Sequence, residues 1–176
     1  MQEESLVKSQ KEIVIAYQEA HNAHDIDGAL SYFSPKIRFG MTGLWVREGL
    51  EEVRELEEWD AVMSSQLGLI NFKMRNQRLE CSGTETNDWF AIVGIKQIRY
   101  EPIKFEFEGD KIRHIRAQIA PKDEMMVDRA VNEVVRWALD IYPNEIHDLV
   151  PRGVFKYGHK HALRWKKLLE DWKQAT

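Results

Sequence analysis

The side chains best suited to chemistry lie in two stretches of this sequence. Tyr17 and His21 are four residues apart, so in a helix they lie one turn apart on the same face. Glu85 and Asn87 are two residues apart, so in a strand they point to the same side. A buried glutamate has a raised pKa unless it is paired, which is how a general acid or base near neutral pH is made. We therefore predict two catalytic residues, Tyr17 and Glu85. Three ligand-binding residues complete the predicted site: His21, Asn87 and Trp89.

Each of these residues also has a structural alternative. Glu85 fits a rim position or an ion pair with an arginine equally well. A tyrosine hydroxyl beside a cavity is more often part of a hydrogen-bonded wall than a catalyst, and this applies to Tyr17. Trp89 could stack on a planar ligand or simply fill a core. These alternatives stay open at the level of the sequence.

A helix must carry Tyr17 and His21. Apolar residues recur at helical spacing from Ile13, so we expect one face of this helix to lie on a core. Asp25 is placed to cap a second, short helix. The expected inward positions of the first helix are Ile13, Ala16, Tyr17, Ala20 and His24.

A third helix is expected from Arg47 to Met63. Its glutamates at 51, 52, 55 and 58 fall on the solvent side of the helical period. The inward positions are Leu50, Val53, Leu56, either Trp59 or Asp60, and Met63.

Period-two patterns predict the strands that carry the remaining site residues. Leu79 and Cys81 should face the interior, and the alternation then turns Glu85 and Asn87 inward as well. Residues 88–97 fit either a continued strand or a short lid helix. The predicted strands are 36–40, one that begins at Gln66, 78–87, 99–108 and 112–119.

The first helix ends in a motif that is specific for fold. It reads Asn22-Ala23-x-Asp25-Ile26-Asp27-Gly28-x-Leu30-x-x-Phe33 and precedes a strand. This resembles the nuclear transport factor 2-like superfamily, which includes ketosteroid isomerases, SnoaL-type polyketide cyclases, scytalone dehydratase and limonene epoxide hydrolase. The resemblance implies an α+β cone, in which a curved, mostly antiparallel sheet is covered by N-terminal helices.

The resemblance also implies a function, with departures that matter. It implies that a small hydrophobic molecule binds in the cone cavity, where a lyase, isomerase or cyclase would act on it. The alternative is a noncatalytic dimeric interaction module with a filled cavity. Tyr17 matches a tyrosine of ketosteroid isomerases, but their aspartate base falls near Met41. Ala117 stands near the aspartate of cyclases and epoxide hydrolases.

Pro121 separates the cone from a C-terminal helical extension. We expect one nuclear transport factor 2-like domain over residues 1–121, and helices over 122–176 that pack on the same domain. Helices are predicted over 125–141 and 160–172, with a short turn at 145–150. Trp137, Phe155, Trp165 and Trp172 are too apolar for these helices to stay unpacked.

Composition limits the possible partners. The 176 residues are 43% hydrophobic with a net charge of -4, and the interspersed charges argue against nucleic acid and membrane surfaces. The charged N-terminus lacks a signal-peptide pattern and Cys81 is the single cysteine, so we expect a cytoplasmic protein. No third ligand accompanies either histidine pair, 21 with 24 or 159 with 161, so we expect no metal and no cofactor. His114 and Arg116 should lie on the outer sheet face, where we expect a homodimer to form.

Overall fold

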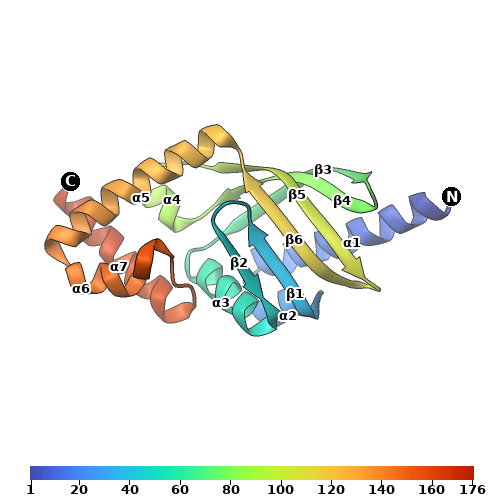
Figure 1. The fold of residues 1–176 in the computed structure, drawn as a ribbon, viewed down its shortest axis with the longest axis horizontal. Coiled ribbons are helices and arrows are strands. Elements are labelled where there is room, and N and C mark those ends of the chain that lie inside the picture. The colour runs from blue at the N-terminus through green and yellow to red at the C-terminus, as the bar shows by residue number, and fades with distance from the viewer.

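A curved sheet lies at the centre of the molecule (Figure 1). Its six strands have the order β2-β1-β6-β5-β4-β3, and only the β1–β6 pair is parallel. The predicted α+β class and mostly antiparallel sheet are therefore confirmed. This computed structural model describes the backbone of residues 1–176 and every side chain except that of Glu3. The strands are β1 Phe33–Met41, β2 Trp45–Glu48, β3 Gln66–Arg75, β4 Arg78–Thr86, β5 Ile98–Glu108 and β6 Lys111–Ile119.

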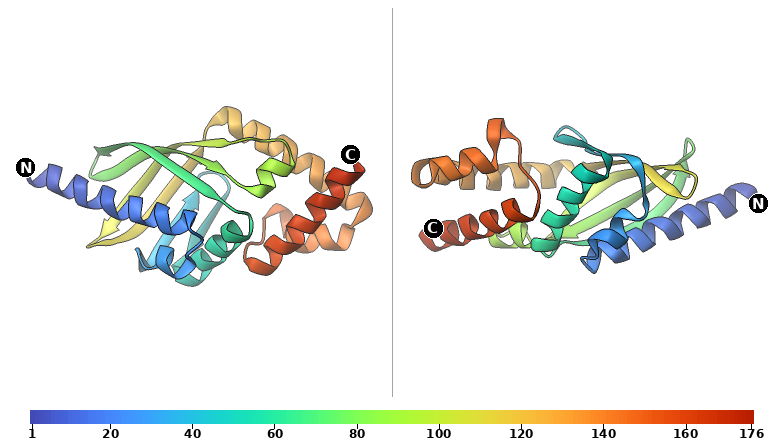
Figure 2. Two further views of the ribbon diagram at one scale, coloured as in Figure 1. Left: turned by 180° about the vertical axis from the view of Figure 1, so that it is seen from behind. Right: turned by 90° about the horizontal axis from the view of Figure 1, so that it is seen from below.

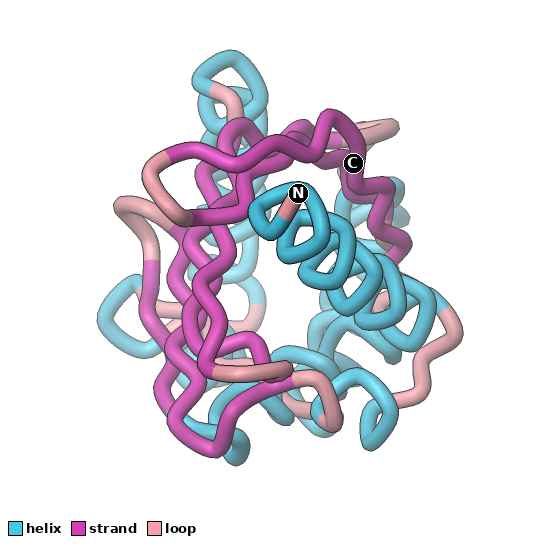
Figure 3. The backbone as a smooth tube through the Cα atoms, turned by 90° about the vertical axis from the view of Figure 1, so that its right-hand side faces the viewer, coloured by secondary structure: helices cyan, strands magenta, loops and turns pink.

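Three helices before β3 cover one face of this sheet. Figure 3 shows the N-terminal helix α1 inside the bend of the sheet; α1 contacts β3, while α3 packs on β1. Asp25 caps α2 as predicted, because its side chain accepts a hydrogen bond from the Gly28 N–H at 3.0 Å. The prediction that His24 faces inward is wrong, since α1 ends at Asn22 and His24 is exposed with a φ of 58°. These helices are α1 Gln2–Asn22, α2 Ile26–Leu30 and α3 Gly49–Val62.

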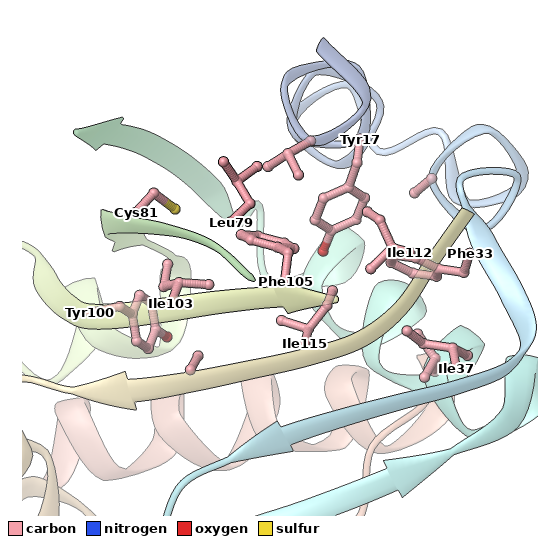
Figure 4. Packing of buried hydrophobic residues seen from close by; sticks show 14 of the residues in the cluster. Tyr17, Phe33, Ile37, Leu79, Cys81, Tyr100, Ile103, Phe105, Ile112 and Ile115 are labelled. Carbon is pink, nitrogen blue, oxygen red and sulfur yellow. The ribbon is translucent and has the colours of Figure 1, made fainter. Parts of the chain in front are cut away.

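Irregular pairing bends the sheet around its interior. The register shifts between Cys81 and Gly83 on β4, and between Tyr100 and Ile103 on β5. Such shifts mark β-bulges, which bend a strand and re-aim its side chains. Tyr100 and Ile103 are both buried although strict alternation would place them on opposite faces. Figure 4 shows Tyr17 reaching from α1 toward the strands over this interior.

The structure contains two short elements that the sequence patterns do not predict. Residues 88–97, left open between strand and helix, begin with helix α4 Asp88–Ile92, whose N-cap is Asn87. Strand β2 is not predicted, since its four residues alternate only between half-buried and exposed at the edge of the sheet. As a consequence α3 begins at Gly49, two residues later than predicted.

The C-terminal helices pack against the end of the cone (Figure 2). α7 contacts α3, α4 and α5, and a second cluster of buried side chains surrounds Trp165. Helix α5 begins at Pro121, the predicted boundary, whereas the division into two units stays a prediction. In the part of the chain that the structure describes, no helix has the length and apolar character of a membrane span. The elements are α5 Pro121–Ile141, α6 Pro143–Leu149, the 3-10 turn η1 Pro151–Gly153 and α7 His159–Ala175.

Candidate functional site

A cavity of about 330 Å³ lies between the sheet, α1, α3 and the loop that precedes α7. Its volume is at the lower end of the range of small-molecule sites. The lining is mostly apolar, with a few polar groups. All five residues predicted for the site line it: Tyr17, His21, Glu85, Asn87 and Trp89.

The mouth of the cavity is marked by lining residues that remain exposed. These are Leu44 in the β1–β2 turn, Asp128 on α5, and Gly153 with Val154 after α6. The C-terminal extension therefore forms part of the entrance. The cone alone would leave this side of the cavity open.

Glu57 holds the two site residues of α1. Its Oε1 accepts a hydrogen bond from the Tyr17 hydroxyl at 3.0 Å, and its Oε2 lies 2.8 Å from His21 Nδ1. His21 Nε2 lies 3.1 Å from Ser65 Oγ, and Ser65 in turn donates to Glu85 at 3.1 Å. A continuous chain of side chains therefore joins α1 and α3 to β4.

This chain of hydrogen bonds is satisfied when His21 carries both ring protons. A carboxylate only accepts hydrogen bonds, so His21 Nδ1 must donate to Glu57. The Ser65 hydroxyl donates its one hydrogen to Glu85, so Ser65 can only accept from His21, and Nε2 must donate as well. Burial alone would lower the pKa of His21, but the hydrogen bond to Glu57 and its charge raise it to about 9. His21 is therefore an imidazolium paired with Glu57 at neutral pH.

Glu85 is surrounded by hydrogen-bond donors. Besides Ser65, the Asn87 amide donates to its Oε1 at 2.8 Å, and the Tyr100 hydroxyl donates to its Oε2. The other end of the Asn87 amide accepts from the Phe90 N–H at 2.9 Å and so starts α4. Strand alternation thus correctly predicts that Glu85 points inward, where it is 9% exposed.

Asp60 differs from these two glutamates. Its carboxyl lines the cavity, and no described side chain donates a hydrogen bond to it. Burial raises its pKa well above the ordinary range, and the negative charge of Glu85 raises it further, against a smaller opposing effect of His21. Asp60 therefore holds its proton more tightly than an ordinary aspartate does, and it faces the space that a ligand would fill.

An aromatic wall faces the mouth. Tyr157, in the loop before α7, makes edge contacts with Trp59 and Trp45 at ring-centre distances of 5.6 and 5.9 Å. The Arg47 guanidinium lies 4.9 Å from the Tyr157 ring centre and donates to the Phe155 carbonyl at 3.4 Å. These contacts fix the loop of the extension on α3 and β2.

Sequence patterns miss much of this site. Glu57 and Asp60 lie on a glutamate-rich helix, where one expects solvent-facing carboxylates, and only the spacing of Val53, Glu57 and Asp60 hints at a shared face. Trp59 and Asp60, left as alternatives, both turn inward. Ser65 and Tyr157 lie in connections, for which periodicity gives no direction.

The outer sheet face carries charges. His114 lies 3.6 Å from Glu106, and Arg116 is exposed. The apolar residues on the opposite face of β6, Ile115, Ala117 and Ile119, line the cavity. Among the described residues, no three His, Cys, Asp or Glu side chains group as a metal site requires.

Comparison with known proteins identifies the fold and nothing narrower. No protein-family model and no curated protein matches the sequence. The epoxide hydrolase/cyclase-like enzyme SalBIII, involved in pyran ring formation in the polyether salinomycin, has a similar structure at a TM-score of 0.59 and 19% identity. That alignment covers 70% of this chain and 97% of SalBIII.

Two proteins of unknown function are similar as well. A nuclear transport factor 2-like protein from Cytophaga hutchinsonii aligns with a TM-score of 0.53 and 13% identity, over 66% of this chain and 94% of its own. A cystatin-like protein from Methylobium petroleophilum aligns with a TM-score of 0.54 and 16% identity, over 64% and 76%. The chain has the nuclear transport factor 2-like fold, as its motif predicts. About a third of it lies outside each alignment.

Proposed function

We propose that this protein binds a small, mostly apolar molecule in the cone cavity and exchanges a proton with it, as an isomerase, lyase or cyclase does. The observation that carries the proposal is the difference between Asp60 and its neighbours. Asp60 faces the cavity without a hydrogen-bond donor, while both nearby glutamates are held by donors. A carboxyl whose pKa is raised and that is free to contact a ligand can serve in acid–base catalysis.

The other polar groups act by holding this arrangement. Tyr17 and His21 fix Glu57, and Glu85 supplies the charge that raises the pKa of Asp60. We therefore assign proton transfer to Asp60 and positioning to Tyr17 and Glu85, the two residues that strand and helix spacing predict as catalytic. His21, Asn87 and Trp89 remain proposed ligand contacts.

The apolar lining supports a hydrophobic ligand. Ile98, Phe105, Ile115 and Val131 contribute side chains without polar atoms to the cavity. The acids that ketosteroid isomerases and cyclases use are absent from their positions, so a carbonyl substrate would have to react through a different acid. Asp60 approaches the same interior from α3 instead of from the sheet.

The test is proton exchange with bound compounds. A panel of small hydrophobic ketones, lactones and epoxides is screened by thermal shift, and each compound that binds is incubated with the protein in D2O and followed by NMR. We expect deuterium incorporation or conversion that is lost in Asp60→Asn. Glu80→Gln is the matched control, because Glu80 is a buried carboxylate that lies next to Arg75 and Lys104 and is absent from the cavity lining. Binding without any exchange would contradict catalysis.

The second candidate is a noncatalytic dimeric module. The charged outer sheet face around His114 and Arg116 favours it, since such domains commonly pair through this face. Sedimentation of the wild type and of Arg116→Glu tests dimerisation: we expect a dimer that the reversed charge weakens. A dimer together with an absence of any cavity ligand would favour this candidate over the enzyme.

A further inference from the structure

Glu85 has no cation beside it, unlike the other buried carboxylates. Glu57 lies 2.8 Å from His21. Glu80 lies 3.8 Å from Arg75 and 3.7 Å from Lys104, and Asp123 lies 3.0 Å from Arg99. Among the described residues, no Lys, Arg or His nitrogen comes within 4.0 Å of Glu85, although it is only 9% exposed.

Hydrogen bonds stabilise Glu85 but do not cancel its charge. Its donors are Ser65, Asn87 and Tyr100, all neutral groups. A buried charge is costly unless an opposite charge balances it, and His21, the one positive group near Glu85 among the described residues, is already paired with Glu57. Of the four described carboxylates that are at most 9% exposed, Glu57, Glu80, Glu85 and Asp123, only Glu85 lacks a counter-ion, and it lines the cavity.

The cavity walls suit a positive charge. No Lys or Arg is among the described residues that line the cavity. Arg47, which lies beside Tyr157, is 3.6 Å from Glu55 and does not line the cavity. Aromatic rings attract cations through the negative potential of their faces, most strongly where water is excluded. The Trp and Tyr residues of the cavity lining, apart from Tyr17, and Phe155 supply such rings: Trp45, Trp59, Trp89, Tyr100, Phe155 and Tyr157.

We propose that the ligand of this cavity is a small organic cation with apolar groups around its charge, such as a tertiary or quaternary ammonium compound, and that Glu85 is its counter-ion. The inference rests on the proposed function, because it names the ligand of the same cavity. Anionic ligands are disfavoured, since Glu85 would repel them and no lining Lys or Arg would receive them.

A bound cation also changes the state of Asp60. The titratable groups around Asp60 come from five elements. They are Glu57 on its own helix, Tyr17 and His21 on α1, Glu85 on β4, Tyr100 on β5 and Tyr157 of the extension. A cation at Glu85 offsets the repulsion between Glu85 and the Asp60 carboxylate, so it lowers the pKa of Asp60, while burial, the largest cause of the raised pKa, continues to raise it. Ligand binding should therefore release part of a proton from Asp60.

Matched ligands test the charge preference directly. Choline and 3,3-dimethylbutan-1-ol have the same shape and differ in charge, and benzyltrimethylammonium adds a ring. Calorimetry at pH 7 should show the cations binding at least about tenfold more tightly than the neutral alcohol. Repeating the titration in phosphate and in Tris measures protons released, and we expect up to about one per cation. Glu85→Gln should remove the preference, while Glu80→Gln should keep it.

Each contrary result separates the two proposals. Equal binding of choline and its neutral isostere, or tighter binding of benzoate, would overturn the cation inference and leave the proposed function standing. If no cation binds while a neutral compound exchanges deuterium, the cation inference is likewise overturned and the proposed function stands. Tight cation binding without any exchange in D2O would support the inference and contradict catalysis. The comparison of choline with its neutral isostere uses the wild type, so the test stays decisive even where Glu85→Gln fails to fold.

Discussion

The interior of the cone and the interior of the C-terminal extension are built differently. Around Trp165 the buried side chains are Val134, Ala138, Leu149 and Leu169, all apolar and closely packed. Between α1 and the sheet, apolar residues share the interior with the polar groups of the Tyr17–Glu57–His21 network, and a cavity remains. Burying charged groups costs stability even when they are paired and hydrogen-bonded, and the proposed ligand site would account for this cost in the cone.

The largest loss of stability should follow a substitution in the core of the C-terminal extension. Trp165 is 0% exposed and stacks on Phe155 with ring centres 4.9 Å apart, and Phe155 lines the cavity. We expect Trp165→Ala to lower the free energy of unfolding by about 3–5 kcal/mol in urea denaturation. Leu163→Ala, on the same helix but half exposed, should change it by less than about 1 kcal/mol. Equal effects of the two variants would contradict a packed core here.

In the cone, the free energy of unfolding should depend on pH through His21. The pKa of His21 is about 9 when folded and about 6.5 when unfolded, so folding binds a proton between these values. Its contribution is complete below pH 6.5 and is lost as the pH rises through 9, by about 3 kcal/mol in total. Urea denaturation at pH 6, 7.5 and 9 should show this loss for the wild type and not for His21→Gln. Parallel pH curves for the two proteins would show that His21 is not a paired imidazolium.

The raised pKa of Asp60 also makes stability fall as the pH rises, but substituting Asp60 should stabilise the protein, whereas substituting His21 should destabilise it. Its folded pKa is raised, so above the ordinary aspartate range the folded state must keep a proton that the unfolded state releases. Asp60→Asn removes this cost, and we expect a gain of order 1 kcal/mol or more in unfolding free energy at pH 7 that disappears near pH 4. Asp140→Asn on α5, where the side chain is exposed, serves as the control in thermal denaturation. A loss of stability at pH 7 would mean that Asp60 has a structural role.

The smallest effect concerns Tyr17. The Tyr17 hydroxyl makes one hydrogen bond to Glu57. Without that hydroxyl, Glu57 would still contact His21 through its other oxygen. Tyr17→Phe should therefore cost about 1 kcal/mol in urea denaturation and reduce D2O exchange only partly. Complete loss of exchange with intact ligand binding would instead show that Tyr17 acts on the ligand itself.

The sequence predicts repeated patterns well and isolated contacts poorly. The motif around Asp25 gives the fold, and alternation through Leu79 and Cys81 turns Glu85 inward. The inward positions of Glu57 and Asp60 are not predicted, because their helix is rich in glutamates. Which of its acidic side chains face the interior depends on how α3 packs on β1. A bulge in β5 between Tyr100 and Ile103 moves Tyr100 out of strict alternation, and no local sequence pattern predicts it.

The extension shows a second limit of sequence reasoning. Its amphipathic helices are visible in the sequence, and their tryptophans predict packing. That Phe155 and Tyr157 form a wall of the cavity depends on contacts between distant segments, such as the Gly158 N–H that donates to the Glu55 carbonyl at 3.0 Å. Such contacts follow from the tertiary structure and leave no periodic signal.

Titration of the Asp60 carboxyl by carbon-13 NMR measures the charge state on which this account depends. The wild type is compared with Asp60→Asn, so that the missing signal assigns the resonance. We predict an inflection far above the usual aspartate range, which moves downward when choline is added. An inflection near pH 4 in the unliganded protein would contradict it, because Asp60 would then be an ordinary ionised carboxylate.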